Sequence, residues 1–271
     1  SSQIDLIPEH VNSIKSWMQA QGIYIKEISI NETIGPLDTN NPGKIVNYFA
    51  SLEKAKINSA ARACWEEPSA NNISSCINYS LDGLLNAIDK KPRPSWWTYK
   101  AYSDLKGTLY NLTPTLSFDG LASYDTAYNS FTLLIGNKAH AGQNLTIRLT
   151  NLHNINNLIS TDKVEVSLQK IPNQVDGSSL NEIVTIGKII YPVINGELVI
   201  EGIGSVSSGD AYIIKILPIQ TDVCASFTYT DWSTCTNSTQ TRTITSSLPA
   251  GCTGGSPVLS QTCQAINSVV C

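Results

Sequence analysis

A carboxylate that could do chemistry stands directly after an alternating strand pattern in the stretch KEISINETIGP, residues 26–36. Glu32 ends this pattern, and a Gly-Pro pair breaks the chain shortly after it. Such a group is either a solvated residue at a strand end or one half of a catalytic carboxyl pair, in which one member is the nucleophile and the other the general acid–base. We expect Asn31 to point to the opposite side of the strand, and we interpret it as a supporting residue.

A second group of candidate residues follows the short segment INSAARACW. Trp65 is either a platform for the ring of a bound ligand or a core aromatic. Glu66 and Glu67 come next, and both are candidates for hydrogen bonds with ligand hydroxyls, although a loop carboxylate pair can equally be a solvated one. Cys64 and Cys76 flank this loop, so a disulfide between them would make it rigid.

The elements that must position these residues alternate between helix and strand over residues 1–106. The predicted helices, each with a Pro near its start, are residues 8–21, 41–56 and 94–106, and the predicted strands are residues 25–31 and 57–65. Asn41 can cap the second helix, and Val11, Ile14, Trp17 and Met18 recur at helical spacing as an apolar face of the first. This is the order of a parallel α/β fold. Two parallel strands do not form a stable sheet alone, and a (β/α)8 barrel needs about 250 residues. We therefore predict that residues 1–106 are the C-terminal part of such a barrel.

The rest of the chain predicts two further domains. Residues 107–219 contain short alternating segments separated by turn residues, which is typical of an antiparallel β-sandwich. These segments are LTPTLSF, SFTLLIG, NLTIRLTNL, KVEVSLQKI, EIVTIGKIIYPV, GELVIEGI and AYIIKILP. Residues 220–271 have almost no apolar core, so we predict a small third domain that disulfides stabilise.

The chain has seven cysteines, of which five lie in the last 48 of its 271 residues. Neither a C-x-x-C pair nor a neighbouring His gives them the spacing of a zinc site, so we predict disulfides and neither a metal nor a cofactor. The cysteines assigned to disulfides are Cys64, Cys76, Cys224, Cys235, Cys252 and Cys263. Cys271 is left over at the end of the chain.

The composition excludes some classes of partner. Only 15% of the residues are charged, the net charge is −4 and the isoelectric point is about 5.4, which argues against a nucleic-acid surface. Apolar runs stay below the ~20 residues that cross a bilayer, so we predict no transmembrane segment. Ser, Thr and Asn fill the polar positions, as in many secreted β-rich proteins. We therefore predict an extracellular or cell-surface protein whose signal peptide lies upstream of this sequence.

Three motifs, ISINETIG, SAARACW and RPSWWTYKAY, resemble the last quarter of the (β/α)8 catalytic domain of glycoside hydrolases related to family 39. In that family a Glu at the end of the seventh barrel strand is the nucleophile, a Trp commonly ends the eighth strand, and a small β-sandwich follows. The resemblance covers residues 1–219. It implies that Glu32 is the nucleophile of a retaining glycoside hydrolase, and that Trp65, Asn31 and Glu66 contact the carbohydrate.

A retaining mechanism needs a second carboxyl group about 5–5.5 Å from the nucleophile. The resemblance places this acid–base residue on the fourth barrel strand, which the predicted elements of this chain do not include. Either an upstream segment or another chain supplies it and completes the barrel, or the protein has lost catalysis.

The stretch CASFTYTDWSTCTNSTQTRTITSSLPAGCTGGSPVLSQTC resembles a thrombospondin type 1 repeat. That family stacks Trp and Arg side chains between thin strands that disulfides cap. Trp232 and Arg242 would form one such cation–π layer, worth about 0.5–2 kcal/mol. The resemblance implies contact with a cell surface or with extracellular matrix.

Two classes of function remain open. The first is a secreted retaining glycoside hydrolase, which is an enzyme if the upstream barrel is present. The second is a non-catalytic extracellular protein with an adhesion, structural or carbohydrate-binding role. A carbohydrate-binding sandwich would expose aromatic side chains on one sheet face, and the candidates are Tyr124, Tyr128, Phe131 and Tyr191.

Overall fold

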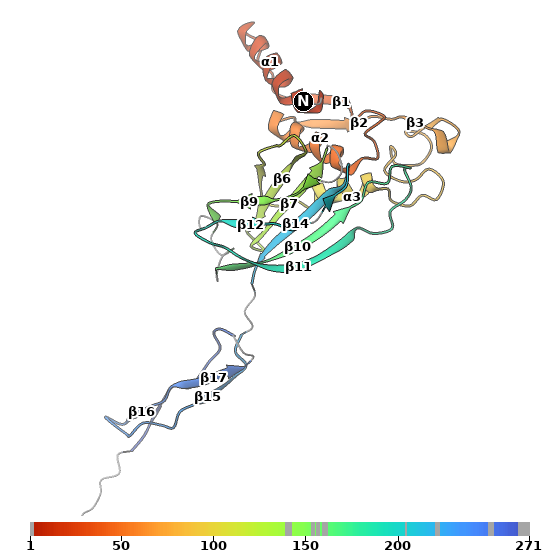
Figure 1. The fold of residues 1–271 in the computed structure, drawn as a ribbon. Helices are drawn as coiled ribbons and strands as arrows, with labels where there is room; N and C mark the ends of the chain where they lie inside the picture. The colour runs from red at the N-terminus through yellow and green to blue at the C-terminus, as the bar shows by residue number, and fades with distance from the viewer. Residues whose placement is uncertain are drawn as a thin grey trace, which may run out of the picture. The chain divides into compact units, whose positions relative to one another are not determined.

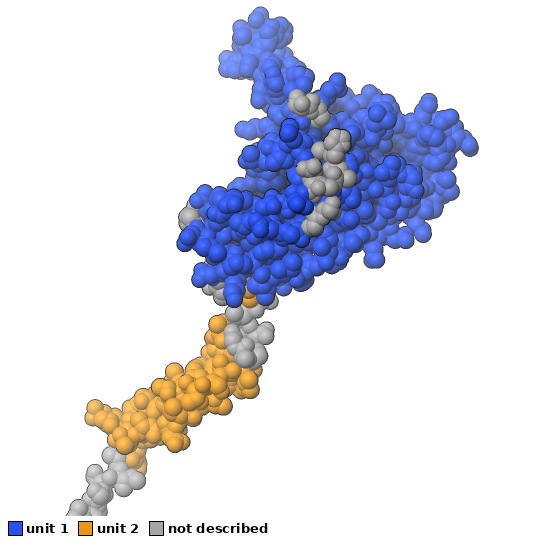
Figure 2. Space-filling view, viewed as in Figure 1, with its two compact units in different colours: residues 1–218 blue, residues 219–271 orange. Residues whose placement is uncertain are grey.

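The computed structural model describes residues 3–138, 143–152, 155, 158, 162–203, 205–219, 223–248 and 252–264. Cys271 lies outside the described residues. The chain divides into two compact units, Ser1–Pro218 and Ile219–Cys271, which Figure 2 colours separately. Among the described helices, none has the length and apolar character that crossing a membrane requires.

The first part of unit 1 has the predicted order of helices and strands (Figure 1). Its elements are η1 (Gln3–Leu6), α1 (Ile7–Ala20), β1 (Ser29–Thr33), α2 (Pro42–Ala55), β2 (Ser59–Arg62), β3 (Glu66–Glu67), η2 (Pro68–Ala70), β4 (Ile73–Ser74) and α3 (Pro94–Ser103). Strands β1 and β2 pair in parallel, and α2 is the crossover between them. Strands β3 and β4 form a small antiparallel pair in the loop between β2 and α3.

An antiparallel six-stranded sheet forms the rest of unit 1, in the order β11-β10-β14-β7-β6-β5. Its strands are β5 (Thr108–Asn111), β6 (Phe118–Asp125), β7 (Ser130–Asn137), β10 (Lys163–Ile171), β11 (Val184–Pro192) and β14 (Ala211–Pro218). A second layer consists of two short pairs, β12 (Leu198–Ile200) with β9 (Ile147–Leu149), and β13 (Ser205–Val206) with β8 (Gln143–Asn144).

The six-stranded sheet is covered on both faces. One face packs with β9, β12 and β13 in a core that includes Leu133, Val166 and Ile214. The other face packs against α2 and α3, in a core that includes Leu134 of β7 and Ala101 of α3. Neighbouring residues of a strand point to opposite faces, and both faces of this sheet are covered. Strand β7 therefore buries nearly all of its residues.

Helix α2 fixes the β1–β2 pair to this sheet. Asn41 caps the helix as predicted, since its side chain accepts a hydrogen bond from the Lys44 N–H at 3.0 Å. A Cβ atom at Gly43 would lie 2.3 Å from the carbonyl oxygen of Asn137, so only glycine lets the helix approach β7 so closely. These contacts hold both sides of the predicted boundary at residue 106 in one compact unit, and the domain boundaries themselves stay predictions.

The strand pattern of the sandwich differs from the prediction at its start. The segment LTPTLSF lies almost entirely between strands, because β5 ends at Asn111 and β6 begins at Phe118. Strand β6 reads FDGLASYD and contains Asp119, whose carboxylate forms an ion pair with Lys54 of α2 at 2.7 Å. The sequence of β6 does not alternate between apolar and polar residues, because both faces of the strand are buried.

Of the four aromatic residues named as candidates for exposure on one face of the sandwich, three are buried or partly buried. Tyr124 is 8% exposed and Phe131 6% exposed, and both belong to the sandwich core. Tyr191 is partly buried against the same core, and only Tyr128, at 76%, is exposed. Alternation along β6 and β7 directs the first two rings inward.

Unit 2 is built from paired strands and disulfides. Strand β15 (Ser226–Tyr229) pairs with β17 (Ile244–Leu248), and β16 (Thr239–Thr241) pairs with β18 (Ser260–Thr262). The prediction that the six assigned cysteines form disulfides is confirmed. The bonds are Cys224–Cys252 and Cys235–Cys263 in unit 2 and Cys64–Cys76 in unit 1.

The predicted contact between Trp232 and Arg242 is also present in unit 2. The guanidinium carbon of Arg242 lies 4.3 Å from the centroid of the Trp232 ring and 3.5 Å from that of Tyr229. The Arg242 Nε–H also donates a hydrogen bond to the carbonyl oxygen of Val258 at 2.8 Å. Tyr229 is thus a third member of this layer, which the sequence did not predict.

Candidate active site at the carboxyl ends of β1 and β2

Glu32 lies in an irregular part of β1, close to the carboxyl end of the strand. The pairing register between β1 and β2 shifts between Ile30 and Thr33, so the Glu32 backbone lies within this irregularity. Its φ is 60°, in the left-handed region that residues other than glycine rarely adopt. Asn31 and Glu32 are both exposed. Within the described part of the chain, the Glu32 carboxylate has no hydrogen-bond or ion-pair partner, so it is available to a ligand.

Trp65 is attached to the end of β1 by a hydrogen bond. Its indole N–H donates to the carbonyl oxygen of Ile34 at 2.9 Å, and Ile34 also has a left-handed φ, of 70°. The backbone N–H of Trp65 donates to the Ser75 hydroxyl at 3.1 Å. The indole is therefore held in one orientation while the residue remains half-buried, which suits a platform for a ligand ring.

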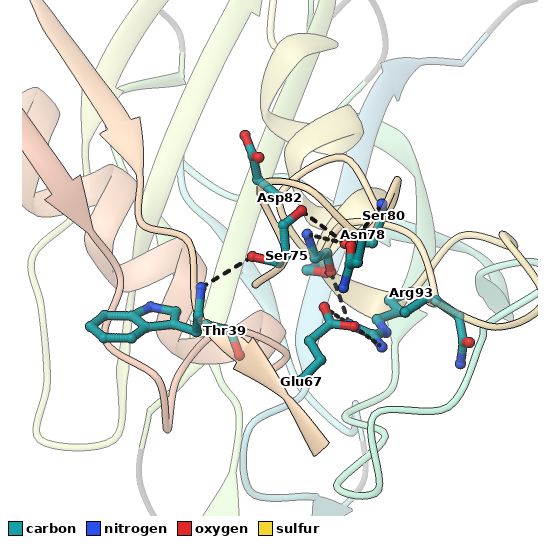
Figure 3. Close-up of polar contacts among 12 residues, drawn as sticks. Thr39, Glu67, Ser75, Asn78, Ser80, Asp82 and Arg93 are labelled. Atoms are coloured by element: carbon teal, nitrogen blue, oxygen red, sulfur yellow. Dashed lines mark hydrogen bonds and ion pairs between the residues drawn. The ribbon is translucent and has the colours of Figure 1, made fainter. Parts of the chain in front are cut away.

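Glu66 and Glu67 have different environments although they are neighbours. They form the short strand β3, so their side chains point to opposite sides: Glu66 is exposed and Glu67 is buried. The Arg93 Nη1–H donates to Glu67 Oε1 at 2.9 Å, and the Nη2–H donates to Oε2 at 3.3 Å, as Figure 3 shows. Glu67 is therefore held in a bidentate ion pair, and Glu66 remains the candidate for ligand contacts.

Three charged side chains converge on Gly83, and we call them the Arg62–Glu67–Arg93 cluster. A Cβ atom at Gly83, where φ is +80°, would lie 3.2 Å from Glu67 Oε1, 3.6 Å from Arg62 Nη2 and 3.8 Å from Arg93 Nη1. Two backbone carbonyl oxygens anchor Arg62. The carbonyl oxygen of Asp82 accepts a hydrogen bond from its Nε–H, and that of Thr39 accepts one from its Nη2–H, both at 2.7 Å. The cluster joins the loops that follow β1 and β2.

Burial changes the acid–base properties of Arg62 and of its neighbour Tyr99. Burial lowers the pKa of the Arg62 guanidinium, and the neighbouring Tyr99 opposes this change. Burial likewise raises the pKa of the Tyr99 phenol, opposed by Arg62. An arginine side chain stays protonated in proteins even with a lowered pKa. The Arg62 guanidinium therefore keeps its charge at neutral pH.

A cleft of about 390 Å³ opens beside this cluster. Residues that follow β1 (Pro36, Thr39 and Asn40) and residues that follow β2 (Trp65 to Ser69) line it, together with the Arg62–Glu67–Arg93 cluster. Of the predicted site residues, Trp65 and Glu66 line this cleft. Asn31 and Glu32 are not among the described residues that line this cleft.

A larger cleft, of about 950 Å³, lies beside α2 and contains none of the predicted site residues. Its charged side chains are paired with one another. These pairs are Lys44–Asp38 at 2.6 Å, Lys54–Asp119 at 2.7 Å and Lys138–Asp5 at 2.7 Å. We therefore place the candidate site at the carboxyl ends of β1 and β2.

One group of potential metal ligands lies near the site. Ligand atoms of Cys64, Cys76 and Asp82 fall within 4.8 Å of one another. The two sulfur atoms are joined in a disulfide, so neither is a thiolate that can bind a metal ion.

Arg62 and Arg93 are parts of the site that were not predicted from the sequence. Arg62 ends a strand of otherwise small residues, SAAR, and a single charge in such a segment is a signal of an internal partner. Arg93 precedes the Pro that starts α3 and gives no comparable signal.

No protein-family profile matches the chain. Over 154 residues, or 53% of the chain, it is 29% identical to the 3-O-alpha-D-galactosyl-alpha-L-arabinofuranosidase of Bifidobacterium longum subsp. longum. The matched part is 12% of that protein, so the chain spans a small part of this curated relative.

Three solved structures share the fold of unit 1. N2152 from Neocallimastix frontalis has a TM-score of 0.65 and 22% identity over 79% of this chain and 51% of its own. The GH39 enzyme from Xanthomonas axonopodis pv. citri has a TM-score of 0.52 and 14% identity, over 81% and 50%. The glucosidase from Croceicoccus marinus has a TM-score of 0.55 and 11% identity, over 80% and 51%. The chain thus has a glycoside hydrolase-like fold and spans about half the length of these structures.

Proposed function

We propose that this chain is part of a secreted retaining glycoside hydrolase in which Glu32 is the nucleophile. The observation that carries the proposal is the exposed Glu32 carboxylate, which has no partner among the described residues, at the carboxyl end of a parallel strand beside a second strand that leads to Trp65. Catalytic residues of β/α barrels lie at this end of the strands. The glycoside hydrolase-like fold and the match to an arabinofuranosidase support the same proposal.

In this mechanism the Glu32 carboxylate attacks the anomeric carbon and forms a covalent glycosyl ester, while a carboxylic acid protonates the departing glycosidic oxygen. The resulting carboxylate then removes a proton from water, which attacks the anomeric carbon and releases Glu32. Asn31 and Glu66 are proposed to bind sugar hydroxyls, and Trp65 to stack on a sugar ring. The acid–base residue is proposed to lie on further barrel strands, in an upstream segment or another chain.

Uncovered surfaces support the presence of further barrel elements. Parallel sheets are normally buried on both faces, yet three of the four residues of β2 are exposed. On α1, Ile14 and Trp17 of the predicted apolar face are 53% and 64% exposed. Additional strands beside β1 and β2 and additional helices on α1 would bury these surfaces.

The test is a substitution of Glu32 in the complete enzyme. We expect Glu32→Gln to lower glycoside cleavage by about a thousandfold or more, because an amide does not form the glycosyl ester. Glu27→Gln is the matched control, since Glu27 is exposed in the same segment and should leave the rate unchanged. With Glu32→Ala, added azide should restore turnover and give a glycosyl azide of inverted configuration. Cleavage that survives Glu32→Gln would refute the role of Glu32.

A second candidate is a non-catalytic carbohydrate-binding or adhesion protein. The cleft beside Trp65 favours it, because Glu32 is not among the described residues that line that cleft. Unit 2, with its two disulfides and exposed surface, would then mediate contact with a cell surface or matrix. A complete protein that binds glycans but cleaves no glycoside would favour this candidate.

A further inference from the structure

The cleft that contains Trp65 has a third wall, which comes from the β-sandwich. Val175, Asp176 and Gly177 line it, and they belong to the connection between β10 and β11, residues 172–183, here called the β10–β11 loop. If Gly177 carried a Cβ atom, that atom would lie 3.2 Å from Asn40 Nδ2, in the loop that follows β1. Two loops of the β/α part and one of the sandwich thus enclose one cleft.

The β10–β11 loop is anchored at both ends. At its start, the Asn173 N–H donates to Asp210 Oδ1 at 2.8 Å. At its end, the Ser179 hydroxyl donates to the Asp89 carboxylate at 2.8 Å. The backbone N–H of Leu180 donates to Pro92 O, and its carbonyl oxygen accepts from the Trp97 indole, both at 2.7 Å. Because ordering a loop on binding costs free energy, an anchored loop is a better ligand wall than a free one.

The chemistry of the walls favours a neutral polyhydroxyl ligand. Four carboxylates and two guanidinium groups line the cleft, namely Glu66, Glu67, Asp82 and Asp176 with Arg62 and Arg93. The excess of negative charge disfavours an anionic ligand. Exposed carboxylates accept hydrogen bonds from hydroxyls, and the Trp65 ring with the 91% exposed Val175 offers apolar surface to C–H groups.

Three polar atoms of residues in these walls are consistent with hydroxyl groups. Among the described residues, Asn40 Oδ1 has no hydrogen-bond donor, and Arg62 Nη1–H and Arg93 Nε–H have no acceptor, although all three atoms are buried. A hydroxyl both donates and accepts, so sugar hydroxyls can serve all three atoms. The Asp176 carboxylate can also accept hydrogen bonds from hydroxyls, because the Ser178 N–H holds the pKa of this carboxyl below its usual value.

We propose that this cleft is a subsite for a neutral sugar unit, and that Val175 and Asp176 of the β10–β11 loop determine which sugar it takes. The proposal rests on the proposed function, because it assigns part of the same carbohydrate site. It gives the sandwich a direct part in substrate recognition, in addition to its packing role.

The test measures binding of xylohexaose, cellohexaose, arabinohexaose and hexagalacturonate to the complete protein by calorimetry, with Glu32→Gln in every variant so that the ligands are not cleaved. We expect at least one neutral hexasaccharide to bind more tightly than hexagalacturonate. Asp176→Ala should weaken that binding about tenfold, which is the usual effect of losing one hydrogen bond to a charged group. Val175→Thr should weaken it about threefold, because it keeps the shape and removes apolar surface. Glu182→Ala is the matched control, an exposed carboxylate of the same loop outside the cleft.

The two proposals fail in different ways. Neutral binding that Asp176→Ala weakens, in a complete protein that cleaves no glycoside, supports the subsite and refutes the enzyme. Equal affinity of the Asp176→Ala and Glu182→Ala chains, preference for hexagalacturonate, or no binding of any hexasaccharide overturns the subsite whatever the activity. Circular dichroism of each variant verifies that its fold is retained.

Discussion

At the residue scale, the left-handed backbone conformation of Glu32 needs a physical explanation. A left-handed φ at a non-glycine residue costs of the order of 1–3 kcal/mol and persists only where the surroundings impose it. Thr33 imposes it here, because it pairs with Arg62 on β2 and its hydroxyl donates to the Ala61 carbonyl oxygen at 2.9 Å.

The ion pair between Glu67 and Arg93 gives a prediction about stability. Their side chains are 12% and 5% exposed, so Glu67→Gln leaves the Arg93 charge buried without its partner. We expect the free energy of unfolding of unit 1 to fall by about 3–5 kcal/mol. Urea unfolding followed by tryptophan fluorescence measures the change.

Glu66→Gln is the matched control for this prediction, because it makes the same chemical change on the exposed side of β3. We expect it to change the free energy of unfolding by less than about 0.5 kcal/mol. Equal effects of the two substitutions would show that the Glu67–Arg93 pair does not stabilise the loop.

At the element scale, the strands differ in how far the sequence reveals them. Strands β7, β10 and β14 coincide closely with predicted segments. Strand β6 is missed because its residues are buried on both faces, and because its polar residue Asp119 is paired with a lysine on a helix far away in sequence. Local alternation does not encode such a partner.

The disulfide between Cys64 and Cys76 gives a prediction about the loop that carries Trp65 and Glu66. Replacing both cysteines by Ser removes a constraint on a loop with a sequence separation of 12, so we expect a loss of about 2–3 kcal/mol. Amide hydrogen exchange should also become faster at Ser75, whose N–H donates to the Trp65 carbonyl oxygen at 2.8 Å.

Replacing Cys235 and Cys263 by Ser is the control, because that bond lies in unit 2. We expect this change to leave the exchange at Ser75 as it is in the unmodified chain. Unchanged exchange after loss of the Cys64–Cys76 bond would mean that the polar contacts alone hold the loop.

At the scale of the whole molecule, buried tyrosines predict how stability depends on pH. Burial raises the pKa of the phenols of Tyr99, Tyr102 and Tyr212. The adjacent carboxylates of Glu53 and Asp210 raise the pKa of Tyr102 and Tyr212 further. In the unfolded chain these phenols ionise near pH 10, whereas in the folded chain they keep their protons.

The sign of the effect follows from this difference. Above about pH 10 the unfolded chain binds fewer protons than the folded chain, so the free energy of unfolding falls as pH rises. We expect urea unfolding to show full stability at pH 8 and a clear loss at pH 11. Tyr102→Phe with Tyr212→Phe should reduce this loss, and the exposed Tyr128→Phe should not. An identical loss in all three chains would contradict the assignment.

The sequence by itself determined the order of helices and strands around β1 and β2, the cap of α2 at Asn41, and a disulfide-stabilised C-terminal unit. These features depend on neighbours within a few residues, through periodicity, capping and cysteine content. Only the tertiary structure decided that Arg62, Glu67 and Arg93 meet at Gly83 and that the β10–β11 loop closes the cleft. The physical reason is that these contacts join segments far apart in sequence, and the packing of α2 and α3 on the sheet brings them together.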